Sequence, residues 1–177
     1  MRPDRRRMCL SALLSFAVGC GSKPDPYLQP VYDAKTGKLE MLKWDRNHDG
    51  RVDAWGHMDG TKLLKIDVDT NGDGKPERWE YYDGTTNMIK AEISTLADGR
   101  VDRIEHTDRG KILSVEADGD GDGRMDRWET YENGRLAVVA FDTTHSGHAD
   151  RRIVYGVDGS QRLEVDAKGN GKFVPVR

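Results

Sequence analysis

Acidic residues recur at every second position in three short segments of the chain. Each segment ends in an Asp-Gly step, and the three segments are Asp45-x-Asn47-x-Asp49-Gly50, Asp69-x-Asn71-x-Asp73-Gly74 and Asp118-x-Asp120-x-Asp122-Gly123. Ca²⁺ prefers roughly six to eight oxygen ligands, and alternate residues of a tightly curved loop point inward to supply them. Glycine permits the sharp bend because it has no Cβ and tolerates a positive φ. The spacing therefore predicts calcium-binding loops.

The expected ligand set has five members in each loop, and its fourth member acts through the backbone carbonyl. The three sets are Asp45, Asn47, Asp49, Arg51 and Asp53; Asp69, Asn71, Asp73, Lys75 and Glu77; and Asp118, Asp120, Asp122, Arg124 and Asp126. An EF-hand loop adds a bidentate Glu at its twelfth position, which Glu80 and Glu129 occupy here. Alternation along a strand would turn Glu80 away from Glu77, so we expect both residues to pair across strands with Arg or Lys. Sites without them would bind calcium in the sub-millimolar to millimolar range.

The alternative is that these residues serve only as turn formers, since Asp, Asn and Gly are common in turns. Turn formation accounts for an Asp-Gly step by itself. It does not account for Asp at every second residue, where like charges repel each other unless a cation lies between them. Both interpretations stay open at the level of the sequence.

A pair of residues made of Asp, Ser or Asn followed by Gly recurs six times along the chain, and we number these copies one to six in chain order. Their glycines are 24, 25, 24, 24 and 24 residues apart, and such a fixed period is typical of a repeat protein. Three copies have lost part of the acidic pattern. Copy three has Ser94, Leu96, Asp98 and Asp102; copy five has Asp142, Thr144, Ser146 and Asp150; copy six has Asp166, Lys168 and Asn170. We expect copies three and six to be turns without metal, and copy five stays undecided.

Aromatic and β-branched runs lie between the acidic segments, and Asp83-Gly84 and Asn133-Gly134 interrupt them. Such a pattern is a strong signal for β-hairpins. Two EF-hand helices do not fit, because only about a dozen residues separate Glu80 from the next acidic copy. We expect an all-β fold, an antiparallel meander of tandem hairpin repeats of about 24 residues joined by the acidic loops. The sheet could be elongated or curled into a barrel.

The N-terminus carries a second signal. Four arginines within the first seven residues precede an apolar stretch of eleven residues, Met8 to Val18, which is too short to span a membrane and typical of a signal peptide. Ala17-Val18-Gly19-Cys20 resembles the lipobox of bacterial lipoproteins, although Ala17 replaces the usual Leu. The resemblance implies cleavage before Cys20 and lipidation of its side chain. The alternative is an ordinary secretory signal with a chance cysteine.

These features divide the chain into a signal peptide (1–19), a lipidated Cys20 with a flexible tether (20–30) and a repeat domain (31–177). Without residues 1–19 the chain has 24 basic and 30 acidic residues, a net charge of −6 that argues against a nucleic-acid partner. Cys20 is then the only cysteine, so no intramolecular disulfide forms and bound metal becomes a candidate staple. Only 36% of the residues are hydrophobic, which favours a thin, partly open sheet.

The acidic loops resemble those of EF-hands, dockerins and thrombospondin type 3 repeats. The full unit, seen in Asp120 to Leu136, is similar to the tandem repeats of uncharacterised bacterial lipoproteins. That resemblance implies a calcium-dependent surface structure and names no reaction. The chain lacks the helices of dockerins and the cysteines of thrombospondin repeats, so neither family's partner is expected here.

The expected function is that of a calcium-binding, lipid-anchored structural or adhesive protein of the bacterial cell envelope, with its anchor in the outer membrane, facing the periplasm or the cell surface. The alternative is an envelope module that binds glycan or protein through a row of Trp55, Trp79 and Trp128. No sequence motif of an enzyme is present, so we expect no catalysis. We expect His145 and His148 to be solvated rather than metal-bound.

Overall fold

The computed structural model describes residues 25–176, which form a single sheet of thirteen strands. The strands are β1 (Leu28–Tyr32), β2 (Leu39–Trp44), β3 (Ala54–Asp59), β4 (Lys62–Val68), β5 (Arg78–Tyr82), β6 (Met88–Ile93), β7 (Arg103–Asp108), β8 (Lys111–Ala117), β9 (Arg127–Glu132), β10 (Arg135–Phe141), β11 (Arg151–Tyr155), β12 (Gln161–Val165) and β13 (Val174–Pro175). Cys20 and the expected signal peptide lie outside the described residues. Within the described part, no helix has the length and apolar character needed to cross a bilayer.

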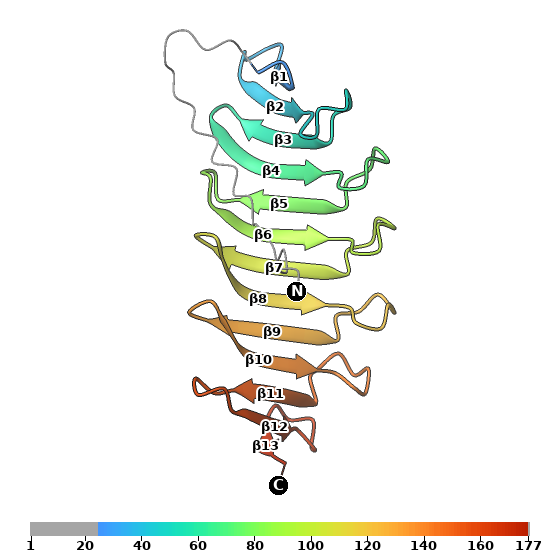
Figure 1. Cartoon of the computed structure of the whole chain (residues 1–177), viewed down its shortest axis with the longest axis vertical. Coiled ribbons are helices and arrows are strands. Elements are labelled where there is room, and N and C mark those ends of the chain that lie inside the picture. The colour runs from blue at the N-terminus through green and yellow to red at the C-terminus, as the bar shows by residue number, and fades with distance from the viewer. Residues whose placement is uncertain (1–24, 177) are drawn as a thin grey trace, which may run out of the picture.

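Each strand pairs antiparallel with its neighbours in the sequence, so the spatial order of the strands is their order along the chain. β1 and β13 lie at opposite ends of a long stack, and the sheet is open (Figure 1). The expected all-β hairpin meander is confirmed, and the elongated form is the one adopted. The sheet begins at Leu28 rather than near Val31, because the backbone N–H of Asp45 donates to the carbonyl of Tyr27 at 3.0 Å and extends the β1–β2 pairing.

The connections alternate between the two sides of the stack. Short turns join β1 to β2 and every following odd strand to the next even strand, on the left in Figure 1. The six acidic loops join each even strand to the next odd strand, on the right in the same view. A meander with a fixed period places every second connection on the same side, which is why all six loops lie in one row.

The hairpin turns follow the chemistry of their residues. Arg109-Gly110 and Asn133-Gly134 are two-residue turns in which both residues have a positive φ, as a type I′ turn requires. The first five hairpins each contain a register shift next to the turn, and the last hairpin, β11–β12, does not. Such bulges increase the local twist of the strands. In the first five hairpins the repeat therefore specifies the local twist as well as the strand pairing.

Directly paired residues share a face, and the register defines two faces of different character. The row Leu42, Gly56, Ile66, Glu80, Ala91, Glu105, Val115, Glu129 and Val139 runs along what we call the Arg–Glu face. The row Trp55, Asp67, Trp79, Glu92, Ile104, Glu116 and Trp128 runs along the opposite one, the Trp face. The buried hydrophobic residues of the described chain all lie on the Arg–Glu face, and they are Leu42, Ala54, Val68, Ala91, Val115 and Val139.

A single-layer sheet needs a cover for its apolar residues, and on the Arg–Glu face long polar side chains provide it. The guanidinium of Arg78 lies 2.8 Å from Glu80 on its own strand and 3.7 Å from Glu105 two strands away. Ala91 of the intervening strand lies between these two Glu residues and has no exposed surface. Because the ion pairs are partly exposed, their contribution arises mainly from covering the aliphatic residues rather than from charge attraction.

Candidate metal centres

The six acidic loops share one backbone conformation. We number their positions from the residue that follows the even strand, so that the conserved step of the repeat falls at positions 5 and 6. Positions 4 and 6 have a positive φ in all six loops: His48, Gly72, Ala97, Gly121, His145 and Gly169 at position 4, and Gly50, Gly74, Gly99, Gly123, Gly147 and Gly171 at position 6. The degenerate loops, copies three, five and six, keep the same conformation as the fully acidic ones. The bend therefore does not require the complete set of carboxylates.

The side chain at position 1 holds the bend by accepting a hydrogen bond from the backbone N–H of the glycine at position 6. The six distances, in chain order, are 2.9, 2.7, 3.2, 2.8, 2.6 and 2.6 Å. The acceptor in copy three is the hydroxyl of Ser94, which shows that a neutral oxygen is sufficient. Position 1 thus has a structural role that our ligand assignment missed, and the persistence of Asp142 and Asp166 in degenerate copies was the signal for it.

The carboxylate at position 9 closes the loop from the other side. It accepts the backbone N–H of position 2 in the first five loops, at 3.1, 2.7, 2.9, 2.8 and 2.6 Å. Asp53 and Glu77 are 8% and 5% exposed. A carboxylate offers about four lone-pair sites, so these hydrogen bonds leave room for a cation.

Positions 3, 5 and 7 form a chain of side-chain-to-backbone hydrogen bonds. The position 3 side chains Asn47, Asn71 and Asp120 accept the N–H of position 5 at 2.9, 2.8 and 3.1 Å. The position 5 side chains Asp49, Asp73 and Asp122 accept the N–H of Arg51, Lys75 and Arg124, each at 2.8 Å. The turn chemistry expected of Asp and Asn is therefore present in each predicted metal loop.

The carboxylates converge in two of the three predicted loops. One oxygen each of Asp69, Asp73 and Glu77 lies within 4.8 Å of the others in copy two, and the same holds for Asp118, Asp120 and Asp126 in copy four. In copy one, Asp45, Asp49 and Asp53 form no such group within residues 25–176. Its amide Asn47 instead donates to Asp49 at 3.1 Å. Copies two and four are thus the loops best arranged for a cation.

The electrostatics of copy four favour the charged form of its first carboxylate. Partial desolvation raises the pKa of Asp118, but hydrogen bonds from the backbone N–H groups of Gly123, Gly121 and Asp122 outweigh it, so this pKa lies below its ordinary value. The loop also carries Asp120, Asp122 and Asp126. A loop with four carboxylates and oriented N–H groups is anionic at neutral pH and attracts divalent cations.

Glu80 and Glu129 lie on the Arg–Glu face of the sheet and not in the acidic loops. Glu80 accepts from Arg78 and from the hydroxyl of Tyr82, both at 2.8 Å, and Glu129 contacts Arg127 at 2.5 Å and Tyr131 at 2.6 Å. The partner type, Arg, is as expected, but the pairs lie within one strand rather than across strands. Residues two apart on a strand share a face, and an Arg side chain is long enough to span that distance. Desolvation, with Glu129 beside it, raises the pKa of Tyr131 to about 12.

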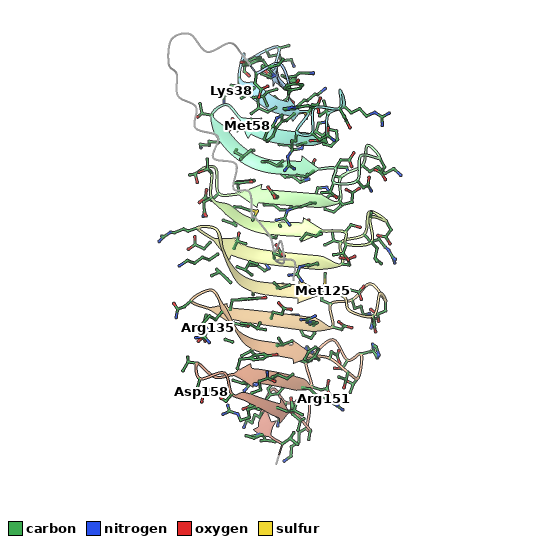
Figure 2. All side chains as sticks on the ribbon, in the orientation of Figure 1. Lys38, Met58, Met125, Arg135, Arg151 and Asp158 are labelled. Atoms are coloured by element: carbon green, nitrogen blue, oxygen red, sulfur yellow. The ribbon has the colours of Figure 1, made fainter. Side chains whose placement is uncertain are left out.

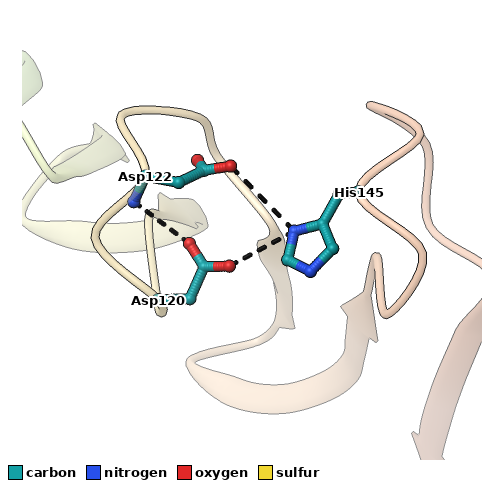
Figure 3. A group of neighbouring side chains, drawn as sticks. All are labelled: Asp120, Asp122 and His145. Carbon is teal, nitrogen blue, oxygen red and sulfur yellow. Dashed lines mark hydrogen bonds and ion pairs between the residues drawn. The ribbon is translucent and has the colours of Figure 1, made fainter.

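Grooves lie between neighbouring loops. Copies three and four enclose one of about 300 Å³, lined by residues that include Leu96, Arg100 and Asp118, and copies one and two enclose one of about 100 Å³. His145 and His148 of copy five are exposed, as expected, and Nδ1 of His145 also lies 3.2 Å from Oδ2 of Asp120 of copy four (Figure 3). Figure 2 shows that polar side chains crowd both sides of the stack.

Trp55, Trp79 and Trp128 lie on the Trp face in one register row, and all three are partly buried. Asp67 lies between the first two, which are therefore two strand spacings, about 9.5 Å, apart. No second layer of the described chain covers this face, which is formed by the single sheet.

Comparison with known proteins identifies no family. No family model matches the chain, and no curated protein matches it. Among solved structures, a chain described as "Crystal structure of GtfA/B complex bound to UDP and GlcNAc" aligns with a TM-score of 0.31 and 13% identity, over 82% of this chain and 25% of that chain. A similarity this low carries no argument about fold or function.

Proposed function

We propose that this chain is a calcium-binding, lipid-anchored structural or adhesive repeat protein of the bacterial cell envelope. The observation that supports the calcium assignment is the excess of carboxylates over what the turn needs. Copy three, with Ser94 and Leu96 at positions 1 and 3, has the same bend as copy four, with Asp118 and Asp120. The additional carboxylates of copies two and four converge, and like charges at this separation favour an intervening cation.

The residues of the loops fit calcium better than a softer metal, because their donors are carboxylate, amide and carbonyl oxygens. Copy two would use Asp69, Asn71, Asp73, the carbonyl of Lys75 and Glu77, and copy four would use Asp118, Asp120, Asp122, the carbonyl of Arg124 and Asp126. Copy one, with Asp45, Asn47, Asp49, Arg51 and Asp53, is the weaker third candidate. An ion in any of these loops would link the two strands that the loop joins.

The test is calorimetric titration of calcium into the soluble form that begins after Cys20 and keeps every described residue. Asp122→Ala should remove one binding equivalent, while Asp98→Ala in copy three should remove none. The two variants are matched, since Asp122 accepts the N–H of Arg124 at 2.8 Å and Asp98 accepts that of Arg100 at 2.9 Å. Equal effects, or no calcium heat in the parent protein at millimolar calcium, would reduce the loops to turn formers.

The lipid anchor is a proposal from the sequence, because Cys20 lies outside the described residues. A diacylglyceryl cysteine supplies two acyl chains, which is enough for stable membrane attachment where one chain is marginal. Cys20→Ser should therefore move the protein out of the detergent-soluble membrane fraction. Unchanged fractionation of that variant would contradict the anchor.

A second candidate function is binding of an envelope glycan or protein by the Trp face. The observation that favours it is the row of Trp55 and Trp79 around Asp67 on an uncovered face, since aromatic rings beside a hydrogen-bonding group suit sugar recognition. A chelator distinguishes the two functions. It should lower the melting temperature if the loops hold calcium and leave it unchanged if they serve only as turns.

A further inference from the structure

The junction between the loops of copies four and five brings together three side chains that the calcium assignment does not unite. His145, at position 4 of copy five, places its Nδ1 3.2 Å from Oδ2 of Asp120 and 4.0 Å from Oδ2 of Asp122 (Figure 3). Asp120 and Asp122 occupy positions 3 and 5 of copy four. The contact therefore joins two neighbouring repeats, and His145 is turned toward both carboxylates (Figure 3).

The carboxylate oxygens of Asp120 and Asp122 that face His145 are not the ones that accept the hydrogen bonds of the turn. Oδ1 of Asp120 accepts the N–H of Asp122 at 3.1 Å, and Oδ1 of Asp122 accepts the N–H of Arg124 at 2.8 Å. The two Oδ2 atoms face His145 instead. One donor atom of each of the three residues lies within 4.8 Å of the other two.

The other junctions of the same chain provide internal comparisons, because the residues at the same three positions of the repeat can be compared at each of them. The corresponding sets are Asn47, Asp49 and Gly72; Asn71, Asp73 and Ala97; Leu96, Asp98 and Gly121; and Thr144, Ser146 and Gly169. None of them combines an imidazole with two carboxylates. Formation of the turn does not require a carboxylate at position 3. Asn71 accepts the backbone N–H of position 5 at 2.8 Å in copy two, as Asp120 does at 3.1 Å in copy four.

We propose that Asp120, Asp122 and His145 bind a divalent transition-metal ion of the zinc type, which staples copy four to copy five. One imidazole nitrogen with two carboxylate oxygens is a donor set suited to Zn²⁺ and its neighbours rather than to Ca²⁺. Tetrahedral ligands at about 2.1 Å from zinc are about 3.4 Å apart. The distance of 3.2 Å from His145 to Asp120 meets that requirement, and Asp122, at 4.0 Å, reaches it by a small side-chain rotation.

All three residues are exposed, so water would complete the coordination. The site shares Asp120 and Asp122 with the calcium set of copy four, and the two ions should therefore compete. The calcium set does not include His145. The zinc proposal and the calcium proposal can therefore be refuted separately.

The test is calorimetric titration of Zn²⁺ into the metal-stripped soluble form that begins after Cys20. His145→Ala should lower the affinity for one equivalent of zinc by at least about tenfold, because it removes a direct ligand. Loss of a residue that only hydrogen-bonds to a ligand already lowers metal affinity by about that factor. His148→Ala, which changes the other histidine of the same loop, should leave that equivalent intact. His145→Ala should also leave the number of calcium equivalents unchanged.

A second variant, which adds a site, tests the proposal even if the His145→Ala protein does not fold. Asn71→Asp combined with Ala97→His rebuilds the same donor set at the junction of copies two and three, and Ala97 already has the positive φ of 55° found for His145, at 57°. This double variant should take up one additional zinc equivalent. Zinc heats that are the same in the parent, His145→Ala and the double variant would overturn the proposal and leave His145 as an ion-pair partner only.

Discussion

Position 4 of the acidic loops illustrates how single residues adjust a common backbone. Its φ is positive in every copy, yet three of the six residues there, His48, Ala97 and His145, are not glycine. A left-handed conformation costs an L-residue about 1–2 kcal/mol, whereas glycine adopts it without that penalty. His48 gains a compensating contact, because its ring stacks on Tyr27 at 3.7 Å between centroids. The methyl group of Ala97 can make no such stacking contact.

Ala97→Gly should therefore raise the free energy of unfolding by about 1 kcal/mol, the strain relieved less the added entropy of the unfolded chain. Urea denaturation measures this difference. Ala149→Gly is the matched control, since Ala149 is also a loop alanine but has no positive φ. That variant should be destabilised by about 0.4–1 kcal/mol. Equal changes in both variants would show that strain at Ala97 is negligible.

The position 1 carboxylates predict how stability depends on pH. Partial desolvation raises the pKa values of Asp142 and Asp166, but backbone N–H groups, including those of Gly147 and Gly171, lower both pKa values below the ordinary 3.8. A lowered folded-state pKa stabilises the protein when the group is ionised. This contribution is fully present above pH 3.8 and is lost as the pH falls through the lowered pKa values.

Urea unfolding in the presence of a chelator should give a constant free energy between about pH 7 and pH 5 and a decrease below about pH 4. Asp142→Asn should reduce the size of that decrease, because the amide keeps an acceptor oxygen but no longer titrates. A protein whose stability stays constant or rises on acidification would contradict this role for the position 1 carboxylates.

At the scale of the element, the two end strands are the exposed parts of an open sheet. Among residues 25–176, β1 pairs only with β2 and β13 only with β12, so no strand of this part of the chain pairs with the outer side of either. Both strands contain a proline, Pro30 and Pro175. Proline has no N–H to donate and is tolerated in a sheet mainly at an edge. The two prolines therefore oppose the addition of a further copy of the sheet.

The double variant Pro30→Val/Pro175→Val should associate through its edges in a concentration-dependent way, whereas the parent protein should not. Sedimentation velocity over a range of concentrations measures this. Pro76→Val is the control, because Pro76 lies in the loop between β4 and β5 and not in a strand. An unchanged sedimentation profile in the double variant would mean that the prolines do not guard the edges.

At the scale of the whole molecule, the strands of residues 25–176 pack against their sequence neighbours, and the ion pair of Arg78 with Glu105 reaches one strand further. Stability should then be approximately a sum over repeats and their interfaces, as in other linear arrays. Truncation after Val157 removes β12 and β13 and leaves β11 as the new end strand.

The truncated protein should unfold at a moderately lower denaturant concentration and keep most of its β-sheet circular dichroism. Truncation at the other end, before Leu39, which removes β1, should have an effect of similar kind. Complete loss of the β signal in either truncation would show that the array folds only as a unit.

Much of the fold follows from local chemistry that the sequence displays directly. The turn at Asn133-Gly134 requires two positive φ values, and the loop from Asp118 to Asp126 is closed by hydrogen bonds between residues at most seven apart. Such contacts depend on residue type and spacing alone, so the period, the hairpins and the acidic loops could all be predicted, while the metal-ligand assignment stays a prediction. The signal peptide and lipidation at Cys20 also come from the sequence and stay predictions.

Only the tertiary structure decided how the repeats combine. The openness of the sheet depends on twist added over thirteen strands, which no single repeat encodes. The partner of Glu80 depends on whether Arg78 reaches along its own strand or across to the next, and the position of His145 against Asp120 depends on the spacing of loops about 24 residues apart. Side-chain contacts between repeats are set by the geometry of stacking, and a local pattern does not contain that geometry.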